Sequence, residues 1–250
     1  MPAQPTPTGV APDLAGTANR PDMFAGWTPS ASNALSRPQG SRAPRLPRGF
    51  ASRYEVVDRF PAPPAPLTQA KHWRSTLVLS SIQTLREFGY FERYASLLPS
   101  HLRDELPTTL AGSWLSMEAA RHHYGACEAL GLSRDEIMTM GLRSGQRAQG
   151  SVFLSAARLA TGVGVSPWAL APLMRRLWER AADGGSGTVY RVGPKESIVE
   201  TVGCDLFDIV YFRVGFAAVM LGLHRLFSRQ AYVHDLTRAR DECVLRFQWV

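Results

Sequence analysis

Alternation of apolar and polar positions is clearest in the last quarter of the chain. Residues 188–192 and 197–202 alternate on either side of Gly193-Pro194, which predicts a hairpin of two short strands. The chain ends on another alternating run, in which every second side chain points the same way: Cys243, Leu245, Phe247 and Trp249. We expect these strands to form a small antiparallel sheet.

Between these strand regions, the segment from Leu206 to Phe227 is strongly apolar and predicts a buried helix. Its uninterrupted part, Val214 to Leu223, is about half of the roughly 20 residues that a membrane span requires, so we expect no span. Gly215 and Gly222 are seven residues apart and share a face. This spacing favours close packing of the helix against the sheet.

Apolar positions recur every three to four residues through most of the segment from Trp73 to Ala182, which is typical of helices. Ser133 and Glu136 form a capping box at one helix start, and Ser166-Pro167 opens another. The helices are predicted near residues 78–88, 91–98, 101–106, 113–130, 133–140, 152–159 and 167–182.

Proline marks a different kind of segment at the start. Thirteen of the 18 prolines precede Thr68, and the stretches between them lack apolar periodicity. Such a segment buries too little apolar surface to offset its ordering entropy, so we expect residues 1–68 to be a disordered Pro/Ala/Arg-rich arm. Residues 69–250 are then a single α+β domain, with a helical N-terminal half packed on an antiparallel sheet formed largely by the C-terminal third.

The charge distribution and the cysteine content indicate which kinds of partner and which cellular compartment to expect. The net charge of +7 is spread along the chain, and no nucleic-acid reading element accompanies it, so a nucleic-acid partner is not expected. Met1 to Asp22 has neither a basic n-region nor an apolar h-region, unlike a secretory signal. The odd number of dispersed cysteines does not suit a disulfide scaffold, so we expect a cytoplasmic protein.

Candidate chemistry is sparse. The cysteines, Cys127, Cys204 and Cys243, lack zinc-site spacing, and the adjacent His122 and His123 face about 100° apart on a helix, so no metal or cofactor is expected. His122 lies on the predicted apolar face of its helix, which favours a packed histidine. An enzyme using Cys127 or His122 would need a tertiary contact between them and a lowered thiol pKa. We therefore do not expect an enzyme.

Aromatic and long apolar side chains are frequent in the helical half and in the C-terminal helix. They can form an ordinary core, or they can line an apolar cavity. The candidates for the wall of a ligand pocket are Trp114, Tyr124, Trp178, Phe216 and Met220.

Three stretches between Lys71 and Val250 resemble a family of uncharacterised proteins found mainly in myxobacteria. They are Ser75-Thr76-Leu77-Val78-Leu79-Ser80-Ser81 before a helix, Leu97-Leu98-Pro99 leading to Trp114, and Val214-Gly215-Phe216 before a closing hairpin that ends in Phe247-Gln248-Trp249. That family is similar to the superfamily of 4-vinyl-reductase sensor domains, haem–nitric-oxide-binding domains and TRAPP vesicle-tethering subunits.

The resemblance implies an α+β fold that encloses a small apolar ligand or dimerises through a helical face. The Tyr-x-Ser-x-Arg motif of the haem-binding branch and the clustered cysteines of the zinc-binding branch are missing from this sequence, so it implies neither haem nor zinc. We expect a non-enzymatic regulatory domain that binds a small hydrophobic ligand and couples it to a protein partner, tethered by the arm. The alternative is a ligand-free interaction or scaffold module that forms a dimer.

Overall fold

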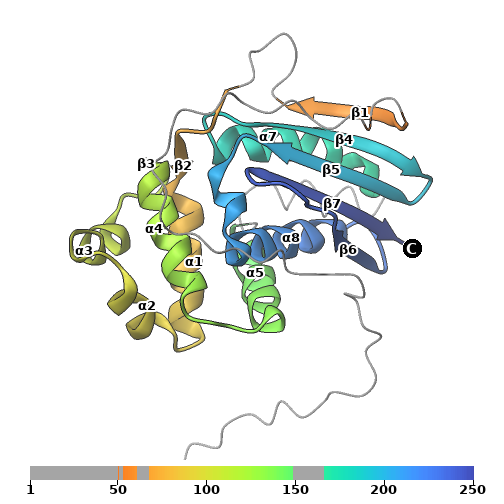
Figure 1. Ribbon diagram of the computed structural model, residues 1–250. Helices are drawn as coiled ribbons and strands as arrows, with labels where there is room; N and C mark the ends of the chain where they lie inside the picture. Colours follow the sequence, from red (N-terminus) through yellow and green to blue (C-terminus); the bar gives the residue numbers. More distant parts are fainter. Residues whose placement is uncertain (1–49, 51–52, 61–67, 149–165) are drawn as a thin grey trace, which may run out of the picture.

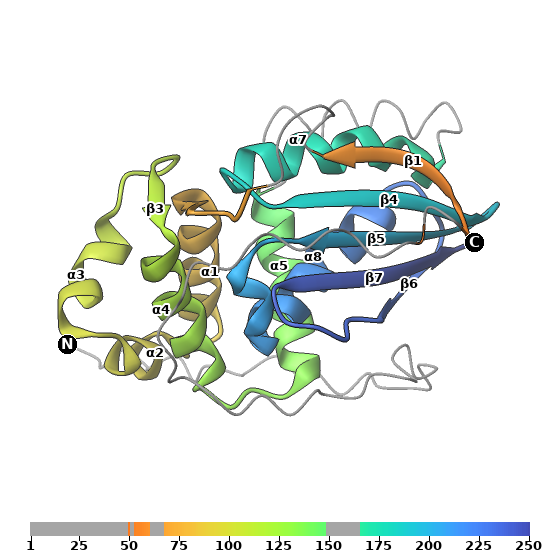
Figure 2. The same cartoon turned by 45° about the horizontal axis from the view of Figure 1, so that its top comes forward.

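The computed structural model describes residue 50 and residues 53–60, 68–148 and 166–250. Most of the expected arm, residues 1–49, and the helix expected near residues 152–159 lie outside these ranges. The described part confirms the predicted α+β fold. Helices cover one face of an antiparallel sheet, and a group of helices from the first half of the chain lies at one end of it (Figures 1 and 2).

Among the described residues, five strands form the sheet in the spatial order β1-β4-β5-β7-β6, and every neighbouring pair is antiparallel. The strands are β1 (Glu55–Phe60), β4 (Ser186–Gly193), β5 (Glu196–Val202), β6 (Ala231–Asp235) and β7 (Glu242–Trp249). The predicted hairpin is the β4–β5 pair. The predicted closing strand is β7, which lies between β5 and β6 rather than at an edge.

Strand β1 corrects the boundary of the arm, because it lies inside the segment that the proline content assigned to disorder. Its residues pair with β4 from Glu55 opposite Arg191 to Phe60 opposite Gly187. The Phe60 ring is 2% exposed and occupies the space that a Cβ on Gly187 would need. A glycine in β4 therefore admits the ring that anchors β1 to the core.

The helices and the short remaining strands follow one another along the chain. The helices are α1 (Ser75–Glu87), α2 (Phe91–Leu97), α3 (Ser100–Thr108), α4 (Met117–Glu128), α5 (Arg134–Ala148), α7 (Ala171–Ala181) and α8 (Val210–His224), with 3-10 turns η2 (Pro167–Leu170) and η3 (Asp205–Asp208). Strands β2 (His72–Arg74) and β3 (Trp114–Ser116) form a separate antiparallel pair. Within the described ranges, no helix combines the length and hydrophobicity of a membrane span.

Helix α4 starts later than its sequence predicts. Residues 114–116 pair with β2 instead of continuing the helix, and the Ala119 amide donates to Ser116 Oγ at 3.1 Å. Ser116 is therefore the N-cap, as serine commonly is. The shift also changes which side chains of this region face inward.

Helices α5 and α8 pack closely through glycine. A Cβ on Gly141 would come within 2.6 Å of Ala218 Cβ and 2.9 Å of the Gly215 carbonyl oxygen. The sequence suggested that Gly215 lets α8 approach the sheet, but a Cβ on Gly215 would meet no atom within 4 Å. The close approach of α8 is therefore to α5, and it depends on Gly141.

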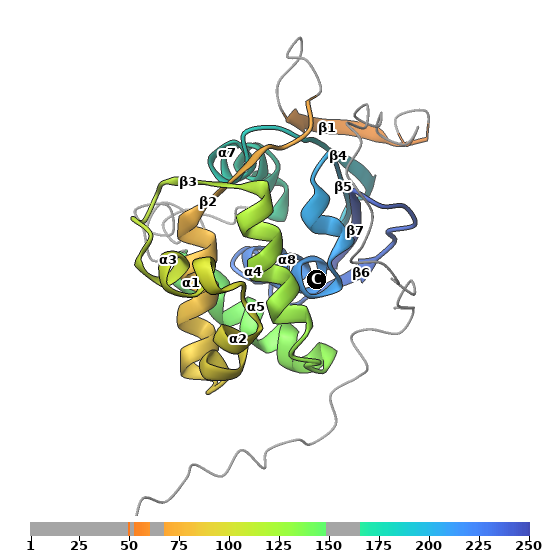
Figure 3. The same cartoon turned by 60° about the vertical axis from the view of Figure 1, so that its left-hand side comes forward.

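The main core lies between the sheet and the helices. Cys243, Leu245, Phe247 and Trp249 of β7 are all at most 5% exposed and belong to this core, which confirms the predicted face. Val244, between them, belongs to a smaller buried cluster on the opposite face of the sheet. In Figure 3, which views the molecule from the helical end, α8 lies between α1 and the sheet.

Candidate functional site: an apolar cavity

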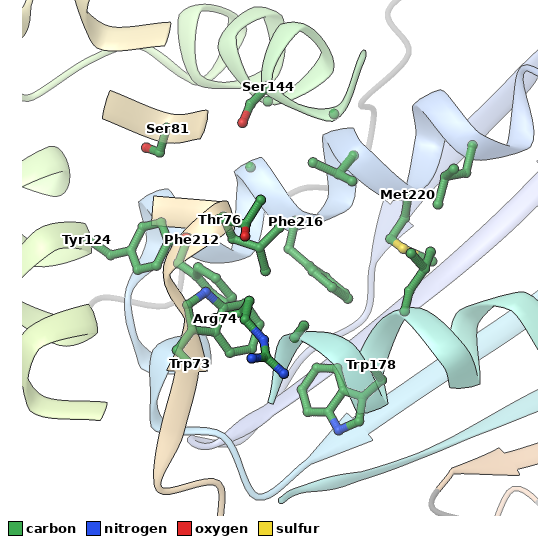
Figure 4. Close-up of a pocket in the computed structure, with 18 of the residues that line it drawn as sticks. Trp73, Arg74, Thr76, Ser81, Tyr124, Ser144, Trp178, Phe212, Phe216 and Met220 are labelled. Atoms are coloured by element: carbon green, nitrogen blue, oxygen red, sulfur yellow. The ribbon is translucent and has the colours of Figure 1, made fainter. Parts of the chain in front are cut away.

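A cavity of about 490 Å³ lies among helices α1, α5, α7 and α8 and the inner face of the sheet. Its wall is mostly aliphatic and aromatic, with a few hydroxyl groups from α1 and α5 (Figure 4). The helical lining comprises Leu77, Ser81 and Thr84 of α1, Ile137, Met140 and Ser144 of α5, Met174, Leu177 and Trp178 of α7, and Phe212, Phe216, Val219, Met220 and Leu223 of α8. The sheet contributes Phe60, Val199 and Thr201.

Glycines and braced rings shape the wall of the cavity. Gly141 and Gly145 of α5 and Gly215 of α8 all line it; a Cβ on Gly141 or Gly145 would meet α8, whereas a Cβ on Gly215 would meet no atom within 4 Å. Trp178 stacks on Phe207 with ring centroids 6.0 Å apart, and Phe207 meets Phe216 edge-on at 5.4 Å. Rings fixed by other rings hold the wall apart, so the space persists without a side chain inside it.

Four of the five predicted pocket residues lie in this wall: Tyr124, Trp178, Phe216 and Met220. Trp114 does not, because its segment is strand β3 and the side chain turns outward, where it is 41% exposed. The guanidinium of Arg74 lies over its ring, 3.5 Å from the centroid. Placing Trp114 in the pocket depended on the helix starting at Ser113, and that prediction was wrong.

Sequence reasoning missed several wall residues, notably Trp73 and Phe212. Trp73 is 2% exposed, and its ring meets those of Phe212 and Trp178 edge-on at 5.3 and 6.1 Å. Met174 and Leu177 could have been found, because they share the predicted apolar stripe of α7 with Trp178. Nothing local marks Trp73, which reaches the wall through the pairing of β2 with β3.

One end of the cavity reaches the surface. Thr76, Gly112 and Arg180 belong to its lining and are exposed, and Arg74 lies beside them partly buried. Arg74 Nη1 donates to the Gly112 carbonyl at 2.7 Å, and Nε donates to the Arg180 carbonyl at 3.0 Å. We call this end, defined by Arg74, Thr76, Gly112 and Arg180, the entrance.

The two adjacent histidines of α4 lie in different surroundings from those that the sequence predicted. His122 is exposed, with Nε2 4.0 Å from Glu118 Oε1, whereas His123 is fully buried. His123 Nδ1 is hydrogen-bonded to the Tyr94 hydroxyl at 2.6 Å, and its Nε2 lies 3.9 Å from Cys127 Sγ. Leu115, Ala126 and Leu130 of the predicted apolar face are buried, but His123 takes the inward position that was assigned to His122.

The pair formed by His123 and Cys127 is poorly suited to nucleophilic catalysis. Burial lowers the pKa of His123 to about 3, and burial raises the pKa of the Cys127 thiol far above its ordinary value. A reactive cysteine needs the opposite shift, toward the thiolate. Cys204 and Cys243 are also buried and free, with pKa values raised by burial.

One branch of the superfamily that the sequence resembles binds haem. The described side chains that line this cavity do not include suitable ligands for haem iron. The described lining of the cavity includes no histidine and no cysteine. Burial raises the pKa of Tyr124 and Tyr211, so these phenols stay protonated and are not phenolate ligands. Methionine serves haem iron in cytochromes c beside a histidine, which is missing from this wall. In the described ranges, no three His, Cys, Asp or Glu side chains form a group that could hold a metal ion.

No protein-family model and no curated protein sequence matches the chain. Solved structures of H-NOX domains do match it. An oxygen-binding H-NOX domain related to soluble guanylate cyclases is 13% identical, covers 70% of this chain and 94% of its own, and has a TM-score of 0.48. An Fe(II) unliganded H-NOX protein from K. algicida is 8% identical over 71% of this chain and 96% of its own, with a TM-score of 0.49. Likeness at this level assigns no ligand to this chain.

Proposed function

We propose that the chain is a non-enzymatic regulatory domain that binds a small hydrophobic molecule and couples its presence to a protein partner. The apolar cavity of about 490 Å³ carries this proposal. Its volume lies within the roughly 300–1,000 Å³ of small-molecule sites, and its composition, mostly apolar with a few hydroxyls, matches them. The histidines His123 and His224 and the three cysteines of the described core are buried, with pKa shifts that disfavour catalysis.

The position of the cavity supports a regulatory role. Its wall joins α1 and α5 to α7, α8 and strands of the sheet, which are far apart along the chain. A ligand that contacts all of them would restrain them relative to one another. A protein that binds a ligand only in its folded form is stabilised as the ligand concentration rises, by about 2.7 kcal/mol at 100 times Kd. In this proposal, the protein partner binds differently to the restrained and the unrestrained domain, and the N-terminal arm tethers the domain to that partner.

Native mass spectrometry of the full chain, purified from its own host, tests this function. The protein is measured under native and denaturing conditions, side by side. We expect an extra mass in the native spectrum that disappears on denaturation and whose composition is that of an apolar small molecule. A bare native mass, together with no binding of any apolar probe to the purified protein, would contradict the ligand-binding function.

A second candidate function is an interaction module without a ligand, acting as a dimer or in a complex. The observation that favours it is the exposure of apolar side chains beside one turn: Leu110 is 80% exposed and Trp114 is 41% exposed. Exposed apolar residues of this kind can mark a protein interface. Light scattering coupled to size exclusion, with Leu110→Ser as the variant, separates the two. A concentration-dependent dimer that Leu110→Ser dissociates would support this alternative.

A further inference from the structure

The entrance of the cavity carries two cations, and neither has an acidic partner among the residues that the structure describes. Arg74 and Arg180 belong to the cavity lining, whose other described members carry no charge. Within the described residues, no carboxylate oxygen lies within 4.0 Å of either guanidinium. On the same helix as Arg180, by contrast, Arg175 Nη1 lies 3.5 Å from Asp58 Oδ1. Unpaired cations at the opening of an apolar space are where an anionic group would be held.

Arg74 is fixed in place rather than free to move. Two of its guanidinium nitrogens donate to the carbonyls of Gly112 and Arg180, and its plane lies 3.5 Å from the centre of the Trp114 ring. Carbonyl groups have no net charge, so these contacts position the cation without neutralising it. Its third nitrogen, Nη2, makes no hydrogen bond within the described residues. A cation fixed in advance binds an anion at a lower entropy cost than a mobile one.

The cavity extends from these two cations into an apolar interior. Figure 4 shows Arg74 beside Trp73, with its guanidinium toward Trp178, while Phe216 and Met220 lie deeper along α8. The carboxyl end of α7 contributes a partial negative charge here, because the Arg180 carbonyl accepts a hydrogen bond from Arg74. The nearby Asp183 carboxylate is bound by the amides of Lys71 and His72 and by the His72 ring. Among the described lining residues the charged ones are Arg74 and Arg180, so the entrance is positive and the interior is apolar.

We propose that the ligand is an amphipathic anion: its apolar body fills the cavity, and its carboxylate or phosphate head lies between Arg74 and Arg180. This inference rests on the proposed ligand-binding function and specifies the class of ligand. Carboxylate and phosphate heads share the chemistry that a guanidinium recognises, because both offer paired oxygens to its N–H groups.

The test compares three probes with the same twelve-carbon chain: dodecanoate, dodecyl phosphate and dodecanol. Each is titrated into the full-length protein below its micelle concentration, and binding is followed through tryptophan fluorescence, because Trp73 and Trp178 line the cavity. We expect at least one anion to bind about tenfold more tightly than dodecanol, which is the size of one charge-assisted hydrogen bond. The preference should shrink as salt is raised.

Charge-neutral variants assign the preference to the entrance. In Arg74→Gln and in Arg180→Gln, the anion should lose about tenfold in affinity while dodecanol keeps its own. Arg180 is exposed, so Arg180→Gln should fold normally even if Arg74→Gln, which loses two carbonyl contacts, does not. Arg176→Gln is the matched control, because Arg176 is exposed on the same helix and lies outside the cavity lining.

The outcomes separate this inference from the proposed function. If dodecanol and both anions bind equally tightly, the anionic head is wrong and the apolar ligand site stands. If anions are preferred but Arg176→Gln removes the preference as fully as Arg180→Gln, the entrance is wrongly assigned. If none of the three probes binds, this inference fails, whereas the proposed function fails only if the native mass spectrum of the protein from its own host also shows a bare mass. The stronger of the two anions identifies the head group.

Discussion

Two sides of α8 are lined by aromatic rings, yet one is solid and the other is hollow. On one side, His224 stacks on Phe247 of β7 with ring centroids 4.0 Å apart and planes 8° apart, and Trp249 lies 5.8 Å away. On the other side, Gly215, Phe216 and Leu223 line the cavity. The same helix thus closes the core on one side and forms the wall of a large space on the other.

The difference shows that aromatic content does not decide whether a region is filled. The rings of the cavity wall meet both edge-on, as Phe207 and Phe216 do, and stacked, as Phe212 and Phe216 do, so ring geometry alone does not distinguish the two sides. The hollow side differs in having Gly215, where a Cβ would meet no atom within 4 Å. We attribute the cavity to this glycine among braced rings, and the following variants test the attribution.

Truncation should cost far more on the solid side than on the hollow side. Phe247→Ala removes a ring that is fully buried and closely stacked, so the free energy of unfolding should fall by about 3–5 kcal/mol. Phe216→Ala removes a ring that already borders empty space, so we expect less than about half of that loss. Urea denaturation of both variants measures the two values. Equal losses would mean that the cavity is filled by protein in solution.

Lowering the pH should destabilise the folded protein through protonation of His224, which lies on the solid side of α8. Burial lowers the pKa of His224 to about 4 in the folded protein, from about 6.5 when unfolded, so the unfolded chain binds more protons between these values. Stability should therefore fall as pH falls from about 6.5 to 4, by up to about 1.4 kcal/mol per pH unit from this residue. His224→Phe keeps a ring against Phe247 and should reduce that slope by about half, because His123, whose pKa burial lowers to about 3, contributes to it equally. An unchanged slope in His224→Phe would contradict this assignment.

The smallest effects should separate Gly141, where a Cβ would collide with α8, from Gly215, where a Cβ would enter open space. Gly141→Ala places a Cβ 2.6 Å from Ala218 Cβ, and overpacking of this kind costs about 1–3 kcal/mol. Gly215→Ala places a Cβ in open space and restricts the unfolded chain, so it should gain about 0.5–1 kcal/mol. Thermal unfolding of the two variants measures the opposite signs. A destabilised Gly215→Ala would mean that the space beside α8 is smaller than described.

The parts of the fold that depend on local patterns could be predicted from the sequence. The β4–β5 hairpin and the inward face of β7 follow from alternation. The capping box at α5 is present, since Ser133 Oγ donates to Glu136 Oε2 at 2.6 Å and the Glu136 amide donates to Ser133 Oγ at 3.3 Å. Each of these signals lies within a few residues of the structure that it determines.

The parts that depend on distant partners could not be predicted. Strand β1 is held by β4, about 130 residues later, and nothing within its own short run reveals that pairing. Trp114 faces outward because its segment pairs with β2, which outweighs the helical pattern that follows it. The cavity likewise depends on the contact of Gly141 with α8 and on the open space beside Gly215, and no single segment of the sequence contains both features.

The most direct test of the ligand site is to fill the cavity and ask whether the bound molecule is lost. Gly215→Leu places a side chain in the open space of the wall. Gly125→Leu is its matched control, because Gly125 is also helical, a Cβ there also meets no atom within 4 Å, and it lies outside the cavity lining. Both variants and the natural protein are purified from the host and measured by native mass spectrometry. We predict that the extra mass persists in Gly125→Leu and is lost in Gly215→Leu; an extra mass retained equally by both variants would show that the ligand does not occupy this cavity.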